Sequence, residues 1–397
     1  MASIPADINP ELLIWAREES GYAADVVAKR IGVKVERLAE WENGGRRPSV
    51  RQVQNLAKYY HRPFGVFFLP QRPAIPPLAA EYRRLPGVRP GVESPEFRLA
   101  LRQMSLRRER TLELNDELAV EGEEFMTAAH ISEGSAVVGR RLREALGVAV
   151  ARQMAWRDEW QAWREWRSAV EGIGVLVFQF PKVPLSQARG LSLLHFPSPV
   201  VGINSKELAP GARIFTLLHE LVHVVLALGQ DERVAIREGR SDSEWAEVEH
   251  FTEEAASEAI IPEDALQAAL RISRVTRDGW DVAQVRSLAA RFRVTPLAMA
   301  TRLRAAGEMT WAGYTRWKDA WAEHVSRLKP RTGGMSTPVD KALSRGGRPF
   351  AQLVIEALDA NRLTAVDASR YLDLRFDHIA TLRTELSAST GAVDDGS

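Results

Sequence analysis

One apolar stretch near the middle of the chain constrains both fold and chemistry more than any other. The run over residues 211–228 contains H-E-L-V-H, in which His219 and His223 flank Glu220. Residues four apart lie on one face of an α-helix, so both imidazoles point the same way. Two such imidazoles can supply two of the three protein ligands of a catalytic Zn²⁺, and Glu220 is within reach of a water at the metal as general base.

The alternative for these residues is an ordinary core helix whose histidines are satisfied inside the protein. That alternative buries two imidazoles and a carboxylate in a very apolar helix, which is costly without partners. A metal ion supplies the partners. The 397-residue chain contains no cysteine, so the ligands of any zinc site must be histidine or carboxylate.

A third ligand is predicted on the next helix along the chain. Residues 241–244, S-D-S-E, have the pattern of a capping box that opens a helix running to Pro262. On this helix Glu249 and Glu253 stand four apart and face the same side. We expect Glu249 to be the third ligand and Glu253 to accept a hydrogen bond from a ligating imidazole, which fixes its tautomer. The alternative is that the glutamates of this helix form a solvated acidic face.

With these two segments the chain resembles the ImmA/IrrE family of zinc metallopeptidases. That family pairs H-E-x-x-H with a second helix of the form E-x-x-x-N-x-x-A-x-x-x-L-x-P. The matching residues here are His219, His223, Glu249, Ala256 and Pro262. Glu253 stands where the family usually has Asn, and this departure touches no ligand. The resemblance implies a small α/β metallopeptidase domain whose substrates are regulatory proteins, typically repressors.

The first 70 residues predict a separate helical bundle of the helix-turn-helix kind. Helices are expected over residues 11–19, 23–31, 34–42, 50–60 and 63–68. The short turn at Gly32 between the second and third helices is the signature of the motif. The segments A-K-R-I-G-V and L-A-E-W-E-N-G-x-x-x-P-S resemble the Xre/Cro-type repressor domain, which implies binding to operator DNA.

The side chains expected to face DNA in this bundle have mixed charge. They are Lys34, Glu36, Arg37 and Glu40 on the third helix, then Arg46, Arg47 and Arg51. Arginines grip the phosphate backbone, whereas a glutamate accepts from cytosine but is repelled by phosphates. We predict DNA binding through these residues, with a protein-interaction or dimerisation module as the alternative.

The remainder of the chain is divided by its composition. A linker rich in proline and arginine is expected over 71–95. The metallopeptidase domain is expected over 96–328, with strands over 172–180, 188–196 and 199–204 immediately before the metal helix. The last two strands are expected to form a hairpin, with Pro197 and Ser198 in its turn. The stretch 189–194 is expected to be an edge strand that pairs with an extended peptide substrate.

The C-terminal part is expected to hold a second linker and a small helical domain. The linker is predicted over 329–348, which is basic and rich in Pro, Gly and Ser, and the domain over 349–390. The spacing of the last helices is similar to a helix-turn-helix, with protein interaction and DNA contact equally open. The whole chain is thus predicted to be mainly α with a small β-sheet, an α+β fold.

The charge and hydropathy of the chain limit where the protein is expected to be located and what it is expected to bind. The net charge is +1, from 53 basic and 52 acidic residues, so DNA binding has to come from a local patch. There is neither a signal-peptide pattern nor a run of about 18 uninterrupted apolar residues, so the expected location is the cytoplasm, with no membrane partner.

Two functions follow from these observations. The first is a zinc-dependent endopeptidase coupled to a DNA-binding domain, which cleaves a repressor or antitoxin-like protein to control transcription. The second is a non-proteolytic regulator or antitoxin-like component of a toxin–antitoxin or mobile-element module, with a toxin as partner. Glu220 favours the enzyme, because a structural zinc site needs no general base and is closed by a fourth protein ligand. A homodimer is left open in both.

Overall fold

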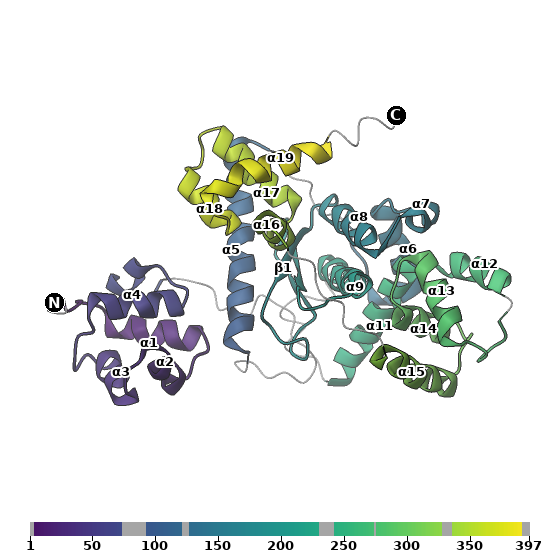
Figure 1. Cartoon of the computed structure of the whole chain (residues 1–397), viewed down its shortest axis with the longest axis horizontal. Helices are drawn as coiled ribbons and strands as arrows, with labels where there is room; N and C mark the ends of the chain where they lie inside the picture. Colours follow the sequence, from purple (N-terminus) through teal and green to yellow (C-terminus); the bar gives the residue numbers. More distant parts are fainter. Residues whose placement is uncertain are drawn as a thin grey trace. The chain divides into compact units, whose positions relative to one another are not determined.

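The computed structural model describes residues 4–73, 93–120, 127–229, 242–273, 275–327 and 336–390. These residues are mainly helical and include one three-stranded sheet, which confirms the predicted α+β class (Figure 1). The chain divides into two compact units, one with the described residues up to Gln103 and one with those from Met104 onward. The boundary falls inside helix α5 (Pro95–Leu118).

The first unit is the predicted helix-turn-helix bundle. Its elements are α1 (Pro10–Glu19), α2 (Ala24–Ile31), α3 (Val35–Glu42), α4 (Val50–Tyr59) and the short 3₁₀ helix η1 (Phe64–Phe68). Local sequence explains the boundaries. The Asn9 side chain caps α1, Gly32 ends α2 at a φ of 75°, and Ser49 forms a capping box with Gln52 at the start of α4. The buried Leu12, Leu38 and Leu56 close the core between these helices.

The sheet of the second unit contains three short strands. They are β1 (Leu176–Phe180), β2 (Gly190–Leu193) and β3 (Val200–Asn204), in the order β1-β3-β2. Strands β2 and β3 pair antiparallel, as expected for a hairpin, and β1 pairs parallel with β3. Strand β2 is therefore an edge strand of this sheet.

Helices cover both faces of the sheet. On one face Val177 and Val201 belong to the hydrophobic core that includes α8 (Glu159–Glu171) and α9 (Pro210–Leu228). On the other face, Gly202 lies against Met104 of α5, since a Cβ atom at position 202 would be 2.5 Å from the Met104 sulfur. The Phe178 ring meets the Phe350 ring edge-on on that face, at 6.1 Å between centroids. The strands are thus buried on both sides, as their nearly continuous apolar sequences require.

Helix α9 is the central helix of this unit. It is long and apolar enough to cross a membrane by length and composition, but 83% of that stretch is buried inside the structure. Its first turn is held by Arg213, whose guanidinium donates to the carbonyl oxygens of Glu207 (2.5 Å) and Ser205 (3.1 Å). Helix α9 is therefore a core helix of this unit, held at its start by a buried cation.

Helix α11 (Asp242–Ile260) packs on α9 and on α6 (Ser135–Ala145). A Cβ atom at Gly139 of α6 would lie 2.5 Å from the Ala255 carbonyl oxygen, so only glycine permits this approach. The C-terminal carbonyls of α11 are satisfied by buried side chains. Arg143 donates to Ala259 (2.7 Å), and Gln153 donates to Ile260 (3.2 Å). These bonds fix the helix that carries Glu249.

Among the residues that the structure describes before 328, the second unit also contains the short 3₁₀ helix η3 (Ile131–Glu133) and five further α-helices. These α-helices are α7 (Val150–Ala155), α12 (Glu263–Ser273), α13 (Val282–Phe292), α14 (Pro296–Ala305) and α15 (Trp311–Ser326). Arg302 of α14 links several of these elements, because it donates to the Ile261 carbonyl (3.0 Å) and pairs with Glu258 and Glu263.

The described residues 336–390 are mainly helical. Their elements are α16 (Pro338–Gly346), α17 (Arg348–Asp359), α18 (Ala365–Leu372), η4 (Phe376–His378) and α19 (Ile379–Thr390). Helix α16 lies within the stretch 329–348, so the prediction of a linker there was wrong for these residues. Thr337 forms a capping box with Asp340, and Arg167 donates to the Leu343 and Ser344 carbonyls at its C-terminus. The other predicted linker, 71–95, falls largely outside the described residues.

Candidate metal centre

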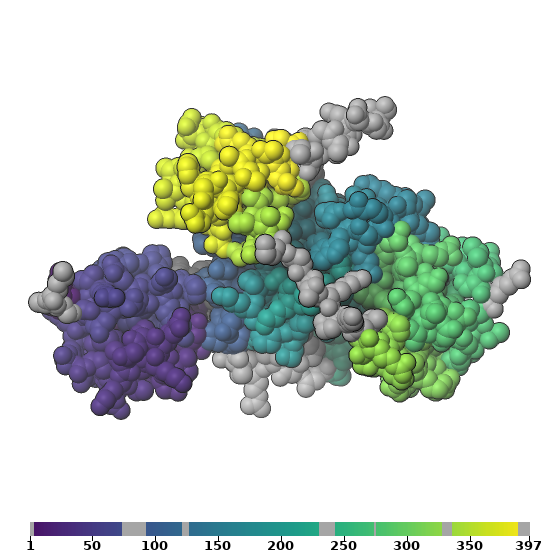
Figure 2. Space-filling view, viewed as in Figure 1, coloured from purple at the N-terminus to yellow at the C-terminus, as the bar shows by residue number. Residues whose placement is uncertain are grey.

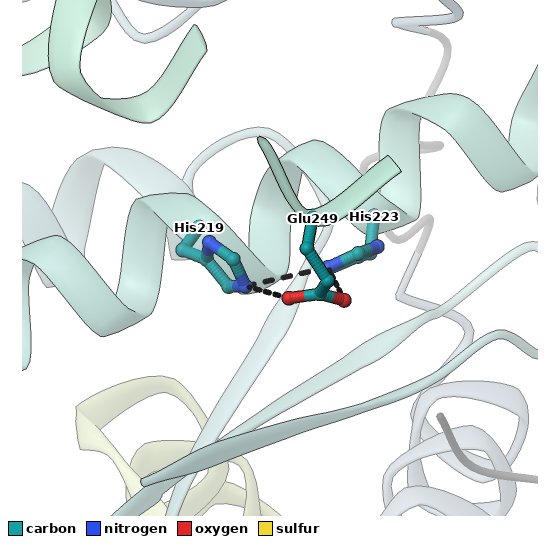
Figure 3. Close-up of side chains that lie close together, drawn as sticks. All are labelled: His219, His223 and Glu249. Carbon is teal, nitrogen blue, oxygen red and sulfur yellow. Dashed lines mark hydrogen bonds and ion pairs between the residues drawn. The ribbon is translucent and has the colours of Figure 1, made fainter. Parts of the chain in front are cut away.

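Three predicted ligand residues converge between α9 and α11 (Figure 3). The Nε2 atoms of His219 and His223 are 3.4 Å apart. The Glu249 carboxylate lies 3.5 Å from the His219 Nε2 through Oε2 and 3.6 Å from the His223 Nε2 through Oε1. The side chains of His219, His223 and Glu249 are 12%, 0% and 18% exposed, so the cluster is largely shielded from water.

The three separations fit a metal ion. Ligand atoms about 2.0–2.1 Å from a tetrahedral zinc ion are about 3.3 Å from one another. The observed 3.4, 3.5 and 3.6 Å are close to this spacing. Two imidazole nitrogens and a carboxylate also form a donor set that catalytic zinc uses, in which the fourth position stays open. The residues present therefore fit Zn²⁺.

Neighbouring side chains orient the ligands. The Phe215 ring, one turn before His219, stacks against its imidazole at 6.2 Å between centroids. On α11, the hydroxyl of the buried Thr252 donates to the Glu249 carbonyl at 2.8 Å. Both contacts come from the helix that carries the ligand, so His219 and Glu249 are supported from within their own helices as well as by the packing of α11 on α9.

Glu220 lies under the first residue of β2. Its side chain is 3% exposed. A Cβ atom at Gly190 would be 2.8 Å from Glu220 Cγ, 3.0 Å from Glu220 Oε1 and 2.5 Å from Thr216 Cγ2. The structure thus places the predicted general base against the backbone of the edge strand. Neither Gly190 nor Thr216 was predicted. Thr216 was detectable because it lies one helical turn before Glu220, whereas no sequence signal pointed to Gly190.

The structure does not bear out the role expected of Glu253. Its side chain is exposed and, among the described residues, makes no hydrogen bond to either imidazole. The neighbouring His250 is exposed as well and pairs with Glu254 at 3.2 Å. Residues 249 and 253 stand four apart, yet only Glu249 reaches the cluster. The exposed side of α11, which carries His250, Glu253 and Glu254, is therefore a solvent-facing polar surface that does not take part in the cluster.

The residues expected to face DNA lie on the surface of the first unit. Lys34, Glu36, Arg46, Arg47 and Arg51 are exposed, and Arg37 and Glu40 are half-buried. Two cations are already paired: Arg37 with Glu40 and Arg47 with Asp7, each at 3.0 Å. A hollow beside α3 is lined by Lys34, Glu36, Arg37, Arg46 and Arg47, among others. Apart from Arg51, the predicted DNA contacts therefore border one concave surface.

The comparisons with known proteins agree with both parts of the chain. Residues 170–304 match a peptidase family model described as the IrrE N-terminal-like domain, and residues 13–67 match a model described as helix-turn-helix. No match was found among curated proteins or solved structures. The first match spans His219, Glu220, His223 and Glu249, and the second spans α2 and α3. The two resemblances read from the sequence are confirmed: the chain combines a helix-turn-helix domain of the DNA-binding type with an IrrE-like peptidase domain.

Proposed function

We propose that this protein is a zinc-dependent endopeptidase that cleaves a regulatory protein, a repressor or antitoxin-like protein, and that its helix-turn-helix domain binds operator DNA. The observation that carries the proposal is the spacing of the His219, His223 and Glu249 donor atoms, 3.4 to 3.6 Å, inside the segment that matches the peptidase model. Such spacing suits one metal ion, and three protein ligands are the number found in catalytic zinc sites, whose fourth position is taken by water or substrate.

Each residue of the cluster has a distinct task in this proposal. His219, His223 and Glu249 hold the metal. When bound, Zn²⁺ supplies Lewis acidity, which polarises a peptide carbonyl and makes water a better nucleophile at neutral pH. The Glu220 carboxylate takes the proton from the attacking water and passes it to the leaving nitrogen of the cleaved peptide bond. Glu220 is buried beneath Gly190, so its carboxylate is shielded from bulk water and lies next to the first residue of β2.

Strand β2 is the proposed docking edge for the substrate. It pairs with β3 along one side and begins at Gly190, directly above Glu220. An extended peptide that adds to the other side of β2 satisfies backbone hydrogen-bonding groups of the edge. Its scissile bond would then lie near Glu220, because the strand and the carboxylate are in van der Waals contact. The substrate is therefore expected to present an extended segment.

The test uses the full-length protein with Zn²⁺ and, as candidate substrates, the proteins encoded next to its gene. Wild type is compared with Glu220→Gln, which keeps the ligands and removes the base. Glu253→Gln is the matched control, since it makes the same chemical change on an exposed residue of α11. Cleavage by wild type and Glu253→Gln, but not by Glu220→Gln, supports the proposal.

Two other results would decide against it. If all three proteins bind zinc and a partner but cut nothing, the chain acts as a non-proteolytic regulator. If none of them binds zinc, the metal centre itself is refuted. Selection from random DNA duplexes tests the operator-binding part separately, because it does not depend on the metal.

A further inference from the structure

The last three helices repeat the pattern of the first three. Residues 353–382 correspond to residues 12–41 one by one, without a gap, so that α17, α18 and the η4–α19 segment take the places of α1, α2 and α3. The corresponding core positions are buried in both. They are Leu12 and Leu353, Leu13 and Val354, Ala16 and Ala357, Val27 and Ala368, Leu38 and Ile379, and Trp41 and Leu382.

The turn between the second and third helices is the same in both segments. Gly32 ends α2 with a φ of 75°, and its counterpart Asp373 ends α18 with a φ of 47°, so both adopt the left-handed conformation. The next residue then donates to a carbonyl five residues back. Val33 donates to Ala28 at 2.9 Å, and Leu374 donates to Ser369 at 3.0 Å.

The start of the third helix also agrees. Lys34 and its counterpart Arg375 both have extended backbone, with ψ of 152° and 147°. Each accepts, through its carbonyl, a bond from the residue three positions on: Arg37 to Lys34 at 3.0 Å and His378 to Arg375 at 3.0 Å. Burial pattern, turn conformation and hydrogen bonding therefore all define a helix-turn-helix at the C-terminal end of the chain.

We propose that α17, α18 and α19 form a second DNA-binding domain, in which η4 and the first turn of α19 enter the major groove of double-stranded DNA. In a helix-turn-helix the N-terminal residues of the second helix of the motif contact base edges. Here these residues are Arg375 and Phe376, followed one turn later by Thr381, and all three are exposed. Phe376 is 67% exposed. In Figure 2 the yellow helices of this domain lie open on the surface of the face shown.

The side chains of Arg375, Phe376 and Thr381 are of types that contact bases in the major groove. Arginine donates to the O6 and N7 atoms of guanine, and the phenyl ring of Phe and the methyl group of Thr contact the methyl group of thymine. The counterparts of Glu36 and Glu40 are Asp377 and Thr381, so the second face carries one carboxylate where the first carries two. Asp377 is paired with Arg375 at 3.1 Å. Repulsion of phosphates is therefore weaker here than at α3.

The charge of the domain also predicts its role in a complex. Residues 336–390 contain as many basic as acidic residues. Few of its side chains are therefore available to contact phosphates. In our proposal this domain contributes sequence specificity through base contacts, and phosphate contacts made elsewhere in the protein contribute much of the binding affinity. The expected target is a DNA site with two separate blocks of sequence, one read by each helix-turn-helix.

The test selects sites for the full-length protein from a library of random DNA duplexes. Wild type is compared with the double variant Phe376→Ala/Thr381→Ala, whose residues lie outside the core. The matched control is Gln352→Ala/Glu356→Ala, two exposed residues on α17 that bond each other at 2.9 Å. A third variant, Arg46→Ala/Arg47→Ala, weakens the first domain.

We expect wild type and control to select sites with two blocks, and Phe376→Ala/Thr381→Ala to lose one block, with affinity for the wild-type site falling about tenfold or more. Arg46→Ala/Arg47→Ala is expected to weaken binding. The sites it still selects should keep the block that Phe376→Ala/Thr381→Ala loses, because that block is read by the C-terminal domain. Equal melting temperatures of the variants show that the fold is retained.

The proposal is overturned if Phe376→Ala/Thr381→Ala selects the same sites as wild type with equal affinity, or if wild type selects no DNA. Loss of binding to a protein partner, with DNA binding unchanged, would identify the domain as a protein-interaction module instead. These outcomes are independent of peptidase activity, so they leave the proposed cleavage untouched.

Discussion

Gly190 and Glu220, thirty residues apart in the sequence, are in direct contact: a Cβ atom at position 190 would lie 2.8 Å from Glu220 Cγ and 3.0 Å from Glu220 Oε1. Glycine is therefore required at the first residue of β2 for the carboxylate to occupy its place beneath the strand. This contact joins the proposed substrate edge to the proposed general base.

The first prediction concerns this contact. Gly190→Ala is expected to displace Glu220 and to lower peptidase activity while zinc binding is kept, because the three atoms nearest to the added Cβ belong to Thr216 and Glu220 and not to a ligand. The added methyl group is expected to lower the free energy of unfolding by about 1–3 kcal/mol. Activity, zinc content and urea unfolding are measured on the same preparation.

A rescue variant sharpens that test. The same Cβ atom would lie 2.5 Å from Thr216 Cγ2. Thr216→Ser removes this methyl group, so Gly190→Ala/Thr216→Ser should recover part of the lost activity. Full activity of Gly190→Ala alone would show that β2 does not lie against Glu220 in solution.

The second prediction concerns the metal. His223 is fully buried in the cluster, and His223→Ala should weaken zinc binding by more than the roughly 10–100-fold that loss of a supporting partner costs. His250→Ala is the control, because it removes an exposed imidazole next to Glu249. A chelator should lower the melting temperature of wild type and of the control, since an ion that binds only the folded state stabilises it. Equal zinc affinity of both variants would remove His223 from the ligand set.

The third prediction concerns base preference at α3. Glu36 is exposed at the start of the helix, and a carboxylate in the major groove can accept a hydrogen bond from the N4 amino group of cytosine. Glu36→Gln should shift the preferred base at one position from cytosine to adenine, a change worth about 1–3 kcal/mol. Glu11→Gln, an exposed change on α1, should leave the selected site as it is. An unchanged preference in Glu36→Gln would exclude this residue from base reading.

The fourth prediction concerns the packing that places Glu249. Gly139→Ala puts a Cβ atom 2.5 Å from the Ala255 carbonyl oxygen and 2.7 Å from Glu258 Cβ, so α6 and α11 have to separate. A loss of about 1–3 kcal/mol in the free energy of unfolding is expected, with weaker zinc binding. Glu144→Ala, an exposed change on the same helix, serves as the control. Unaltered stability of Gly139→Ala would mean that the two helices can move apart without cost.

Some predictions failed because local sequence is an incomplete guide. Thr337 and Pro338 begin a helix in a stretch whose proline, glycine and serine content indicated a linker. A proline at the first helical position is compatible with a helix, so composition alone was misleading. Glu253 shares the spacing of Glu249 but is exposed, because α11 turns only part of that face toward α9.

The sequence by itself predicted the facing imidazoles of His219 and His223, the first helix-turn-helix and the β2–β3 hairpin. Each depends on periodicity or turn chemistry within a few residues, which the local backbone enforces. The tertiary structure alone decided the distances within the cluster, the contact of Gly190 with Glu220, and that Glu249 rather than Glu253 reaches the two imidazoles. These depend on how helices and strands far apart in the chain pack, and close packing is set by the shapes of all the side chains together.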